Sequence, residues 1–499
     1  MKGSCARLRV FATLLAAAAS AACNVGPTYV RPAVSTPRTF REGSAASYAA
    51  LPAGTWRPAR PEDAVLKGKW WEMLHEPELD ALEEQLEINN QTVAQYFQNF
   101  MAARALVNVA RAGYFPTAST GPSFTQTGSG TTARGAAPGS VGTFVQAGAG
   151  SPTSSFFSIP MDASWAPDLW GRVANAVREY RAAAQVSAAD LQNERLTEEA
   201  ALAVDFFELR GQDTLVHLYE RTVSAFRESL AITRAQSETG IGSEEAVVQA
   251  QVTLENAEAT GIGLTAARAL YEHAIATLVG KPASSFAMPV RDLSTPVPAI
   301  PIGLPSQLLE RRPDIAAAER TLAQANALIG VEMTAYYPSL NLSASGALES
   351  STLRTLFSLP AFFWSLGAAA SETIFDGGLR DATVAQYTAL YRADVAAYRQ
   401  TVLTAFQEVE DGVATLRILS QQIARQQAAV ASAQRYVDIA TERYKIGLDP
   451  YLNVVTAQTT LLGDEQTLVT LRVNQMTAAV QLVQSLGGGW DARQLQRAS

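Results

Sequence analysis

The chain has 499 residues, of which 47% are hydrophobic and 17% are charged, and this apolar content excludes a wholly disordered protein. Its formal net charge is −8, from 39 Lys and Arg against 47 Asp and Glu, which excludes a wide basic surface for nucleic acid. Two cysteines exclude a disulfide framework and a Cys-rich zinc site, and three histidines leave little for a His-based metal site or acid–base chemistry.

Residues 1–22 have the layout of a secretory signal, with a basic start, an apolar stretch from Val10 to Ala19 and small residues before Cys23. A cysteine directly after small residues resembles a bacterial lipobox, so we expect acylation of Cys23 and a lipid-anchored N-terminal segment over residues 23–69. Ser20 stands where a lipobox usually has an aliphatic residue, and this leaves an ordinary cleaved signal as the alternative. After Cys23 no apolar run is long enough to predict a transmembrane helix.

The rest of the chain contains an internal repeat. Ala103–Pro116 recurs as Ala325–Pro338, and Gly240–Gln251 recurs as Gly447–Gln458. Two tandem copies of one unit are therefore expected. The predicted divisions are the first copy at 70–288, a Pro-rich connector at 289–307, the second copy at 308–486 and a C-terminal tail at 487–499.

Each copy begins with a helical stretch, about Glu78–Ala112 and Asp314–Ala335, that ends at an aromatic pair followed by proline. Segments with strictly alternating apolar and small or polar residues follow. This alternation is typical of transmembrane β-barrel strands, and a soluble hairpin that covers a core would show it equally. The predicted strands are about 117–133, 153–165, 338–350 and 362–375.

After the strands come two proline-free stretches, 172–239 and 379–446, each of which would span about 100 Å as a helix. Both end at a glycine turn and return, which predicts long helical hairpins at 172–280 and 379–486. Helices this long cannot bury their apolar stripe in one globular core, so we expect packing between chains. Four strands cannot close a membrane barrel and lipid forbids open edges, whereas a trimer would supply twelve strands and six hairpins.

Several motifs resemble the outer-membrane factors of tripartite efflux systems, the TolC-like family in its NodT-type lipoprotein branch. The resemblance covers nearly the whole chain from Cys23 to about Leu486. The motifs are Cys23–Pro32, Trp70-Trp71, Asp168–Arg172, Arg311–Arg320 and Phe375–Arg380.

The resemblance implies an α+β membrane protein built from two tandem structural repeats. A trimeric 12-stranded β-barrel, with four strands per chain, would be continued by a long α-helical coiled-coil barrel. Such a homotrimer would lie in the cell outer membrane, anchored in outer-membrane lipid, with its helical part in the periplasm. Its partners would be a periplasmic adaptor (membrane fusion) protein and an inner-membrane pump of the resistance–nodulation–division (RND) type.

The implied function is passive conduction of small molecules and drugs, without chemistry and without a cofactor. Two alternatives remain open at this point. One is a duct for type I protein secretion, and the other is a non-channel periplasmic coiled-coil lipoprotein.

In the family, residues at the hairpin tips close the periplasmic end of the duct. The matching candidates here are Arg443, Tyr444, Gly447 and Asp449 in the second copy, and Gly240, Glu244 and Glu245 in the first. Carboxylates that often occur on the following helix are replaced by Asn453 and Thr456, which argues against an aspartate ring at that position. The alternative for Arg443 is a simple interaction with the dipole at the end of its helix.

The histidines offer no second site. His75-Glu76 is followed by Pro77, which excludes a helical metalloprotease motif. His217 and His273 are expected to be isolated on amphipathic helices.

Overall fold

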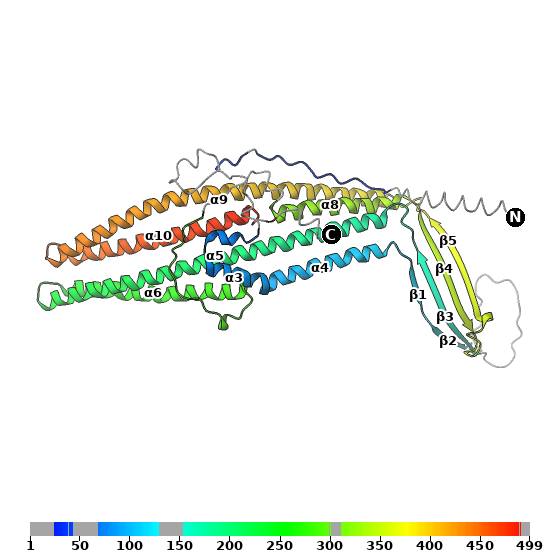
Figure 1. Ribbon diagram of the computed structural model, residues 1–499, viewed down its shortest axis with the longest axis horizontal. Coiled ribbons are helices and arrows are strands. Elements are labelled where there is room, and N and C mark those ends of the chain that lie inside the picture. Colours follow the sequence, from blue (N-terminus) through cyan, green and yellow to red (C-terminus); the bar gives the residue numbers. More distant parts are fainter. Residues whose placement is uncertain are drawn as a thin grey trace. The chain divides into compact units, whose positions relative to one another are not determined.

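The computed structural model describes residues 24–37, 39–42, 68–128, 153–298, 300, 311–488 and 490, and they form two compact units (Figure 1). Each unit takes segments from both halves of the sequence. Unit 1 contains the described residues of 1–29, 105–181 and 323–392, and unit 2 contains those of 30–104, 182–322 and 393–499.

Unit 1 is built around one antiparallel sheet in which β3 and β4 are central. β1 and β2 both pair with β3 at one edge, and β5 pairs with β4 at the other. The strands are β1 (Thr117–Thr120), β2 (Ser123–Gly128), β3 (Thr153–Trp165), β4 (Ser339–Ser350) and β5 (Phe362–Ser371).

The first edge is interrupted at Gly121-Pro122, within a range that the sequence predicts as one strand over 117–133; residues 129–133 lie outside the described residues. The interruption lies opposite Ile159 and Pro160 of β3, because Thr120 pairs with Met161 and Ser123 pairs with Ser158. Proline has no N–H to donate to a ladder, so the two prolines share one break in the pairing.

β5 ends at Ser371, short of the expected residue 375. Its partner β4 begins at Ser339, directly after Pro338, and Ser339 pairs with Ser371. Proline has no N–H to extend the ladder, so the pairing stops there.

The N-terminal residues of unit 1 lie on α5 (Arg172–Glu238) and α8 (Pro313–Met333). The Val25 N–H donates to the Trp170 carbonyl (3.1 Å), and the Asn175 amide donates to the Val25 carbonyl (2.8 Å). Gly26 has φ +137° and approaches Gly330 so closely that a Cβ would lie 2.7 Å from the Gly330 Cα. Glycine is required here by both the backbone conformation and the contact. Cys23 lies outside the described residues.

Unit 2 is helical. The helical stretch expected at 78–112 is divided at Asn90 into α3 (Pro77–Asn89) and α4 (Gln91–Ala112). Asn90 has an extended backbone, and its side-chain oxygen accepts from the Val93 N–H (2.9 Å), which is an N-cap that starts a new helix. Before α3, the short helix η2 (Trp70–Leu74) buries both tryptophans, and the Trp70 indole donates to Glu199 of α5 (2.9 Å).

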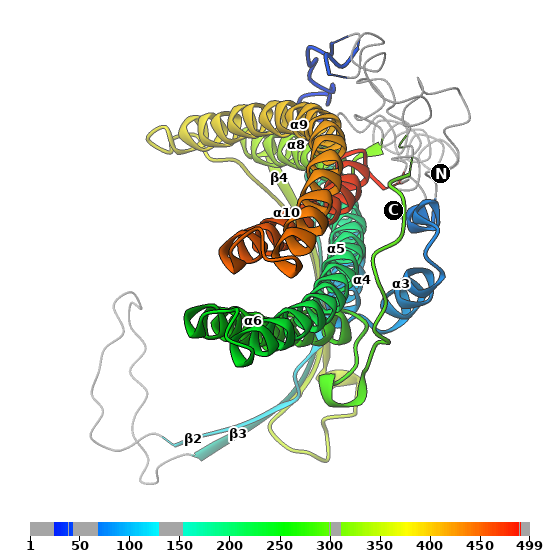
Figure 2. The same cartoon turned by 90° about the vertical axis from the view of Figure 1, so that its left-hand side faces the viewer.

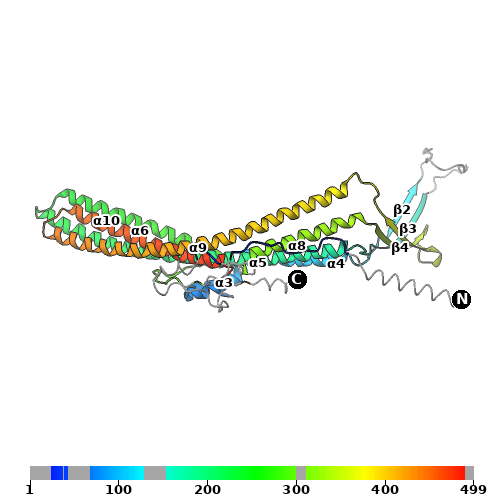
Figure 3. The ribbon, with the colours of Figure 1, turned by 90° about the horizontal axis from the view of Figure 1, so that it is seen from above.

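The hairpins pair α5 with α6 (Glu244–Leu278) and α9 (Leu379–Lys445) with α10 (Tyr451–Ser485). α5 and α9 both have 67 residues, and α6 and α10 both have 35. Within unit 2 the four helices lie side by side (Figures 2 and 3). Of the helices in the described ranges, none has both the length and the apolarity that a membrane span requires.

Candidate functional site

The two hairpins turn at Gly240 and Gly447, and both turns have the same geometry. Gly240 has φ +78° and Gly447 has φ +74°, a left-handed conformation that glycine adopts without the steric cost of a Cβ. In the first turn Gly240 N–H donates to the Ser237 carbonyl and Ile241 N–H to the Gln236 carbonyl. This pair of bonds is a Schellman motif, which satisfies carbonyls at the helix C-terminus.

The second turn repeats the motif. Gly447 N–H donates to the Tyr444 carbonyl (3.0 Å), and Leu448 N–H donates to the Arg443 carbonyl (2.8 Å). Both turns are thus short and backbone-bonded, so the side chains beside them are held in defined positions.

Arg443 and Asp449 form an ion pair across the second turn. Arg443 Nε donates to Asp449 Oδ2 at 2.6 Å, and Nη2 donates to Oδ1 at 3.3 Å, so the contact is bidentate. The hydrogen bond from Arg443 lowers the pKa of Asp449, with a smaller contribution from a hydrogen bond with Asn453. The same pairing raises the pKa of the Arg443 guanidinium. Arg443 therefore forms a specific ion pair with a carboxylate, in addition to any interaction with the dipole at the C-terminus of its helix.

Tyr444 points the other way, into the helix bundle. Its side chain is buried, and its hydroxyl donates to Thr233 Oγ1 of α5 (3.3 Å). Its ring lies 5.4 Å from the ring of Tyr451, the first residue of α10. Burial, and to a lesser extent Tyr444, raises the pKa of Tyr451 to about 12. Arg443 and Tyr444 are therefore adjacent in sequence but have different environments.

A buried cluster drawn from all four helices lies beneath the turns. Two further hydrogen bonds cross it from α10 to α5: Gln458 donates to the Ser229 hydroxyl (2.9 Å), and Gln466 donates to the Tyr219 hydroxyl. With Tyr444 and Thr233 they define a series of polar contacts along α5, which favours one register between the hairpins. The apolar members of the cluster include Phe226, Leu230, Ala250, Leu254, Ala440, Val454 and Ala457.

Glu244 and Glu245 lie in the first turn of α6, after the N-cap Ser243, whose hydroxyl accepts from the Ala246 N–H (3.2 Å). Both carboxylates are exposed, and within the described chain neither forms an ion pair with Arg443. In the first turn of the helix, their negative charges interact favourably with the positive end of the helix dipole. The structure therefore brings Arg443 and Asp449 together and leaves Glu244 and Glu245 on the other turn.

Asn453 and Thr456 follow on α10. Asn453 supports Asp449, whereas the exposed Thr456 donates back to the Leu452 carbonyl of its own helix (2.8 Å). Tyr451, Thr233, Ser229 and Gln458 also belong to this site, and no sequence motif predicted them. Polar residues on these helices could have been noted from the sequence, but only the packing of the helices shows which of them face inward.

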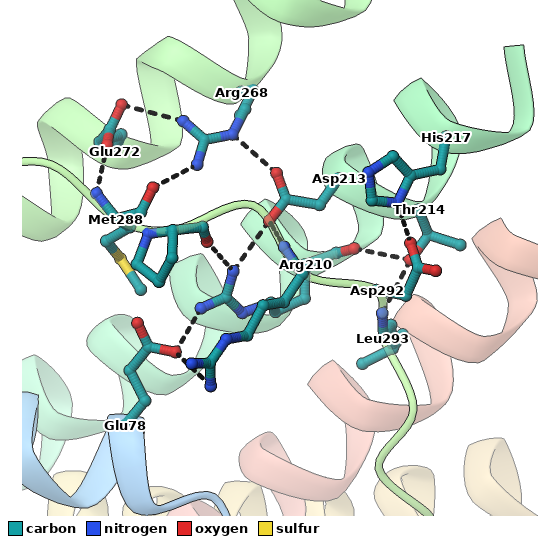
Figure 4. Close-up of polar contacts among 12 residues, drawn as sticks. Glu78, Arg210, Asp213, Thr214, His217, Arg268, Glu272, Met288, Asp292 and Leu293 are labelled. Carbon is teal, nitrogen blue, oxygen red and sulfur yellow. Dashed lines mark hydrogen bonds and ion pairs between the residues drawn. The ribbon is translucent and has the colours of Figure 1, made fainter. Parts of the chain in front are cut away.

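A second polar cluster, also outside the sequence expectations, holds the start of the Pro-rich connector (Figure 4). Asp213 of α5 is fully buried and accepts from Arg210 (2.8 Å) and from Arg268 of α6 (2.7 Å). Arg210 also donates to Glu78 of α3 (2.5 Å). One carboxylate therefore joins α5 to α6, and its arginine partner joins them to α3.

The same side chains bind the connector backbone. Arg210 donates to the Pro289 carbonyl (2.7 Å), Arg268 donates to the Met288 carbonyl (2.8 Å), and Asp213 accepts from the Arg291 N–H (3.0 Å). His217, expected to be isolated, instead has its Nδ1 2.6 Å from Asp292 Oδ1 (Figure 4). Side chains of α5 and α6 thus hold the backbone at the start of the connector, over residues 288–293, and satisfy its polar groups where no regular ladder does.

Within the described residues, no group of three or more His, Cys, Asp or Glu side chains is arranged to hold a metal ion.

Comparison with known proteins identifies the family. A family model described as outer membrane efflux protein matches residues 82–281 and 304–488. The chain belongs to the outer membrane efflux protein family. The probable efflux pump outer membrane protein SepC and the toluene efflux pump outer membrane protein TtgF, both of Pseudomonas putida, are each 31% identical over 476 residues, which cover 94% of both chains.

The solved structure of the outer-membrane channel OprN matches with a TM-score of 0.81 and 26% identity, over 94% of this chain and 100% of that one. As a member of the family, the chain is an outer-membrane channel for efflux, and its fold of a sheet unit and long helices is that of these channels.

Proposed function

We propose that this chain forms, as a homotrimer, the passive outer-membrane duct of a tripartite efflux system of the RND type. A periplasmic adaptor and an inner-membrane pump would deliver small molecules to it. Family membership supports the efflux role, and the relative TtgF, named for toluene efflux, favours small molecules over secreted proteins. The duct catalyses no reaction, in keeping with a family of channels.

The open sheet of unit 1 is the main observation that supports the proposed trimer. Its edges, β1 with β2 on one side and β5 on the other, have no strand partner within the described chain. A membrane cannot satisfy such edges, so each must pair with another copy. With β1 and β2 counted as one strand position, three chains supply twelve positions, enough to close a barrel.

The equal hairpins support the proposal of two tandem repeats. α5 and α9 have the same length, as do α6 and α10, and the turns at Gly240 and Gly447 share one motif. Three chains would provide six hairpins for the continuous helical wall of the duct.

The anchor on Cys23 is part of the same proposal. Residues 24–27 are held on α5 and α8 by the Asn175 contact with Val25 and by an Asn326 amide that donates to the Pro27 carbonyl (2.8 Å). A lipid on Cys23 would therefore be attached close to a fixed part of unit 1. Mass spectrometry of the mature N-terminus tests this, since an unmodified Cys23 there would overturn acylation.

We further propose that the two turns form the periplasmic end of the duct, with Arg443, Tyr444, Gly447 and Asp449 on one turn and Gly240, Glu244 and Glu245 on the other. The bidentate Arg443–Asp449 ion pair and the buried Tyr444 hydrogen bond support this proposal, because both would fix the second turn in one position.

A combined experiment tests the duct. Deletion of the gene in a strain that expresses the pump should increase sensitivity to pump substrates, and the purified protein should form a stable trimer and conduct in planar bilayers. Cysteine pairs that place one residue on β1 and one on β5 should cross-link between chains into a three-membered ladder. A monomer that does not conduct would favour the non-channel lipoprotein, and loss of protein export alone would favour type I secretion.

A further inference from the structure

The sheet of unit 1 has one largely apolar face, and its other face is largely polar apart from a row formed by Pro160, Ala347 and Phe363. The pairing register aligns each face across the strands. Met161 of β3 is paired with Gly346 of β4, which pairs with Trp364 of β5. These residues belong to the apolar set, which also contains Ile159, Ala163, Trp165, Leu340, Leu342, Ala344, Leu348, Phe362 and Leu366. In a membrane barrel the apolar face lies toward lipid and the other face toward the lumen.

The polar face carries a row of hydroxyl groups with one charge in it. Ser119 pairs with Asp162, Asp162 pairs with Ser345, and Ser345 pairs with Ser365. Paired residues on one face have Cβ atoms about 5 Å apart, so Asp162 stands between two serines. The Ser345 hydroxyl donates to the Ser365 hydroxyl (3.3 Å), which shows that the row shares one face.

A second acidic residue lies on the same face. Glu349 of β4 is four residues beyond Ser345, or about 13 Å along the strand. Its partner Ser158 donates to its Oε1 at 3.5 Å. Asp162 and Glu349 are the charged residues of β1 to β5, and these five strands contain no Lys, Arg or His.

Among the residues that the structure describes, neither Asp162 nor Glu349 forms an ion pair, and the side chain of Asp162 is exposed. A carboxylate that serves the fold is usually paired or caps a helix, as Asp168 does by accepting from the N–H groups of Val173 and Ala174. Asp162 and Glu349 do neither.

We propose that Asp162 and Glu349 make the strand-lined part of the channel selective for cations. This inference rests on the proposed barrel. Three copies would place a ring of three Asp162 carboxylates among serine hydroxyls and a second ring of three Glu349 carboxylates about 13 Å away, with no positive charge in the strands to cancel their field. Small cations and cationic substrates would be concentrated in this part of the duct, and anions would be depleted.

Local thiol chemistry tests the field without depending on the state of the helical turns. Ser345→Cys places a thiol beside Asp162, and its rate of reaction with a cationic methanethiosulfonate is compared with that of an anionic one in the outer-membrane trimer. The expected preference for the cationic reagent is at least about threefold, because a unit charge at about 5 Å changes the energy of a monovalent ion by roughly RT even in water. Adding Asp162→Asn should reduce this preference at least twofold.

Controls separate this inference from the proposed function. Ala344→Cys, on the opposite face, should resist both charged reagents, whereas Glu84→Gln, outside the strands, should leave the preference at Ser345→Cys unchanged. An equal rate at Ala344→Cys and Ser345→Cys would overturn the barrel itself. A trimer in which only Ser345→Cys reacts, and in which Asp162→Asn leaves the preference unchanged, would overturn the selectivity and leave the duct intact.

Bilayer recordings provide the second measurement. The ratio of K⁺ to Cl⁻ permeability should fall at least twofold in the Asp162→Asn, Glu349→Gln double variant, and Ser119→Asp should raise it. A double variant with the parent ratio would overturn the proposal.

Discussion

The Arg443 guanidinium donates two hydrogen bonds to the Asp449 carboxylate across the turn that joins α9 to α10. The pair encloses Gly447, whose left-handed backbone brings the two residues together. Each group shifts the pKa of the other toward its charged form. The ion pair thus connects the last turn of α9 with the turn residues that precede α10.

Removal of either charge should loosen this turn. We expect Arg443→Ala and Asp449→Asn each to raise single-channel conductance, because the turn loses its bidentate contact. Lys445→Ala is the matched control, since Lys445 pairs with Glu442 on the exposed surface of the same helix. Conductance that rises equally in the control would show that any lost charge has this effect.

The same pair predicts a pH dependence. The pKa of Asp449 is lowered in the folded protein, so its contribution is present above the ordinary Asp value near 4 and is lost as pH falls through the lower folded value. Conductance should therefore be constant from about pH 7 to 5 and should rise below about pH 4. Asp449→Asn should remove this acid-induced rise, and a rise centred near pH 6 would assign the effect to another group.

Tyr444 and Thr233 should contribute to stability through one buried hydrogen bond. Tyr444→Phe removes the donor and should lower the free energy of unfolding by about 0.5–1.5 kcal/mol. Thr233→Val leaves the phenol unpaired, so a larger loss, up to about 3 kcal/mol, is expected. The double variant in urea unfolding should cost less than the sum, and strict additivity would argue against a direct bond.

Glu83 of α3 is buried, and within the described residues neither of its carboxylate oxygens has a hydrogen-bond partner. Burial, with the charges of Glu199 and Asp80, raises its pKa well above the usual value. The folded state therefore retains a proton that the unfolded state loses, and stability falls as pH rises above about 4.5.

Glu83→Gln should consequently be more stable than the parent at pH 8, by about 1–3 kcal/mol, and nearly equal to it at pH 4. Thermal unfolding in detergent at both values measures the difference. Glu84→Gln, at an exposed neighbour paired with Lys69, should follow the parent at both pH values. An unchanged slope in Glu83→Gln would show that another group titrates.

Asp213 should be important for the fold of unit 2, because it is fully buried and binds two arginines. Asp213→Ala leaves two facing guanidinium groups and should cost about 3–5 kcal/mol. Arg227→Ala breaks an exposed pair with Glu258 and should cost less than about 1 kcal/mol. Limited proteolysis should also cleave the Asp213→Ala variant near residues 288–293, which lose their side-chain contacts.

Elements that depend on local chemistry could be predicted from the residues alone. Glycine at 240 and 447 predicts the turns because few other residues adopt a left-handed backbone cheaply. Proline-free stretches indicated the long helices, and alternation indicated the faces of β3, β4 and β5, because both signals repeat along the chain. The family resemblance followed from motifs spread over both copies.

Which side chains contact each other could be seen only in the packed structure. Asn90 divides a stretch that looks continuous, and Pro122 and Pro160 fall at one break because the register places Gly121 and Pro122 opposite Pro160 and Ile159. The bond from Tyr444 to Thr233 spans 211 positions. Such contacts depend on the rotation and register of packed helices and strands, which are set by the burial of the whole face and leave no local pattern in the sequence.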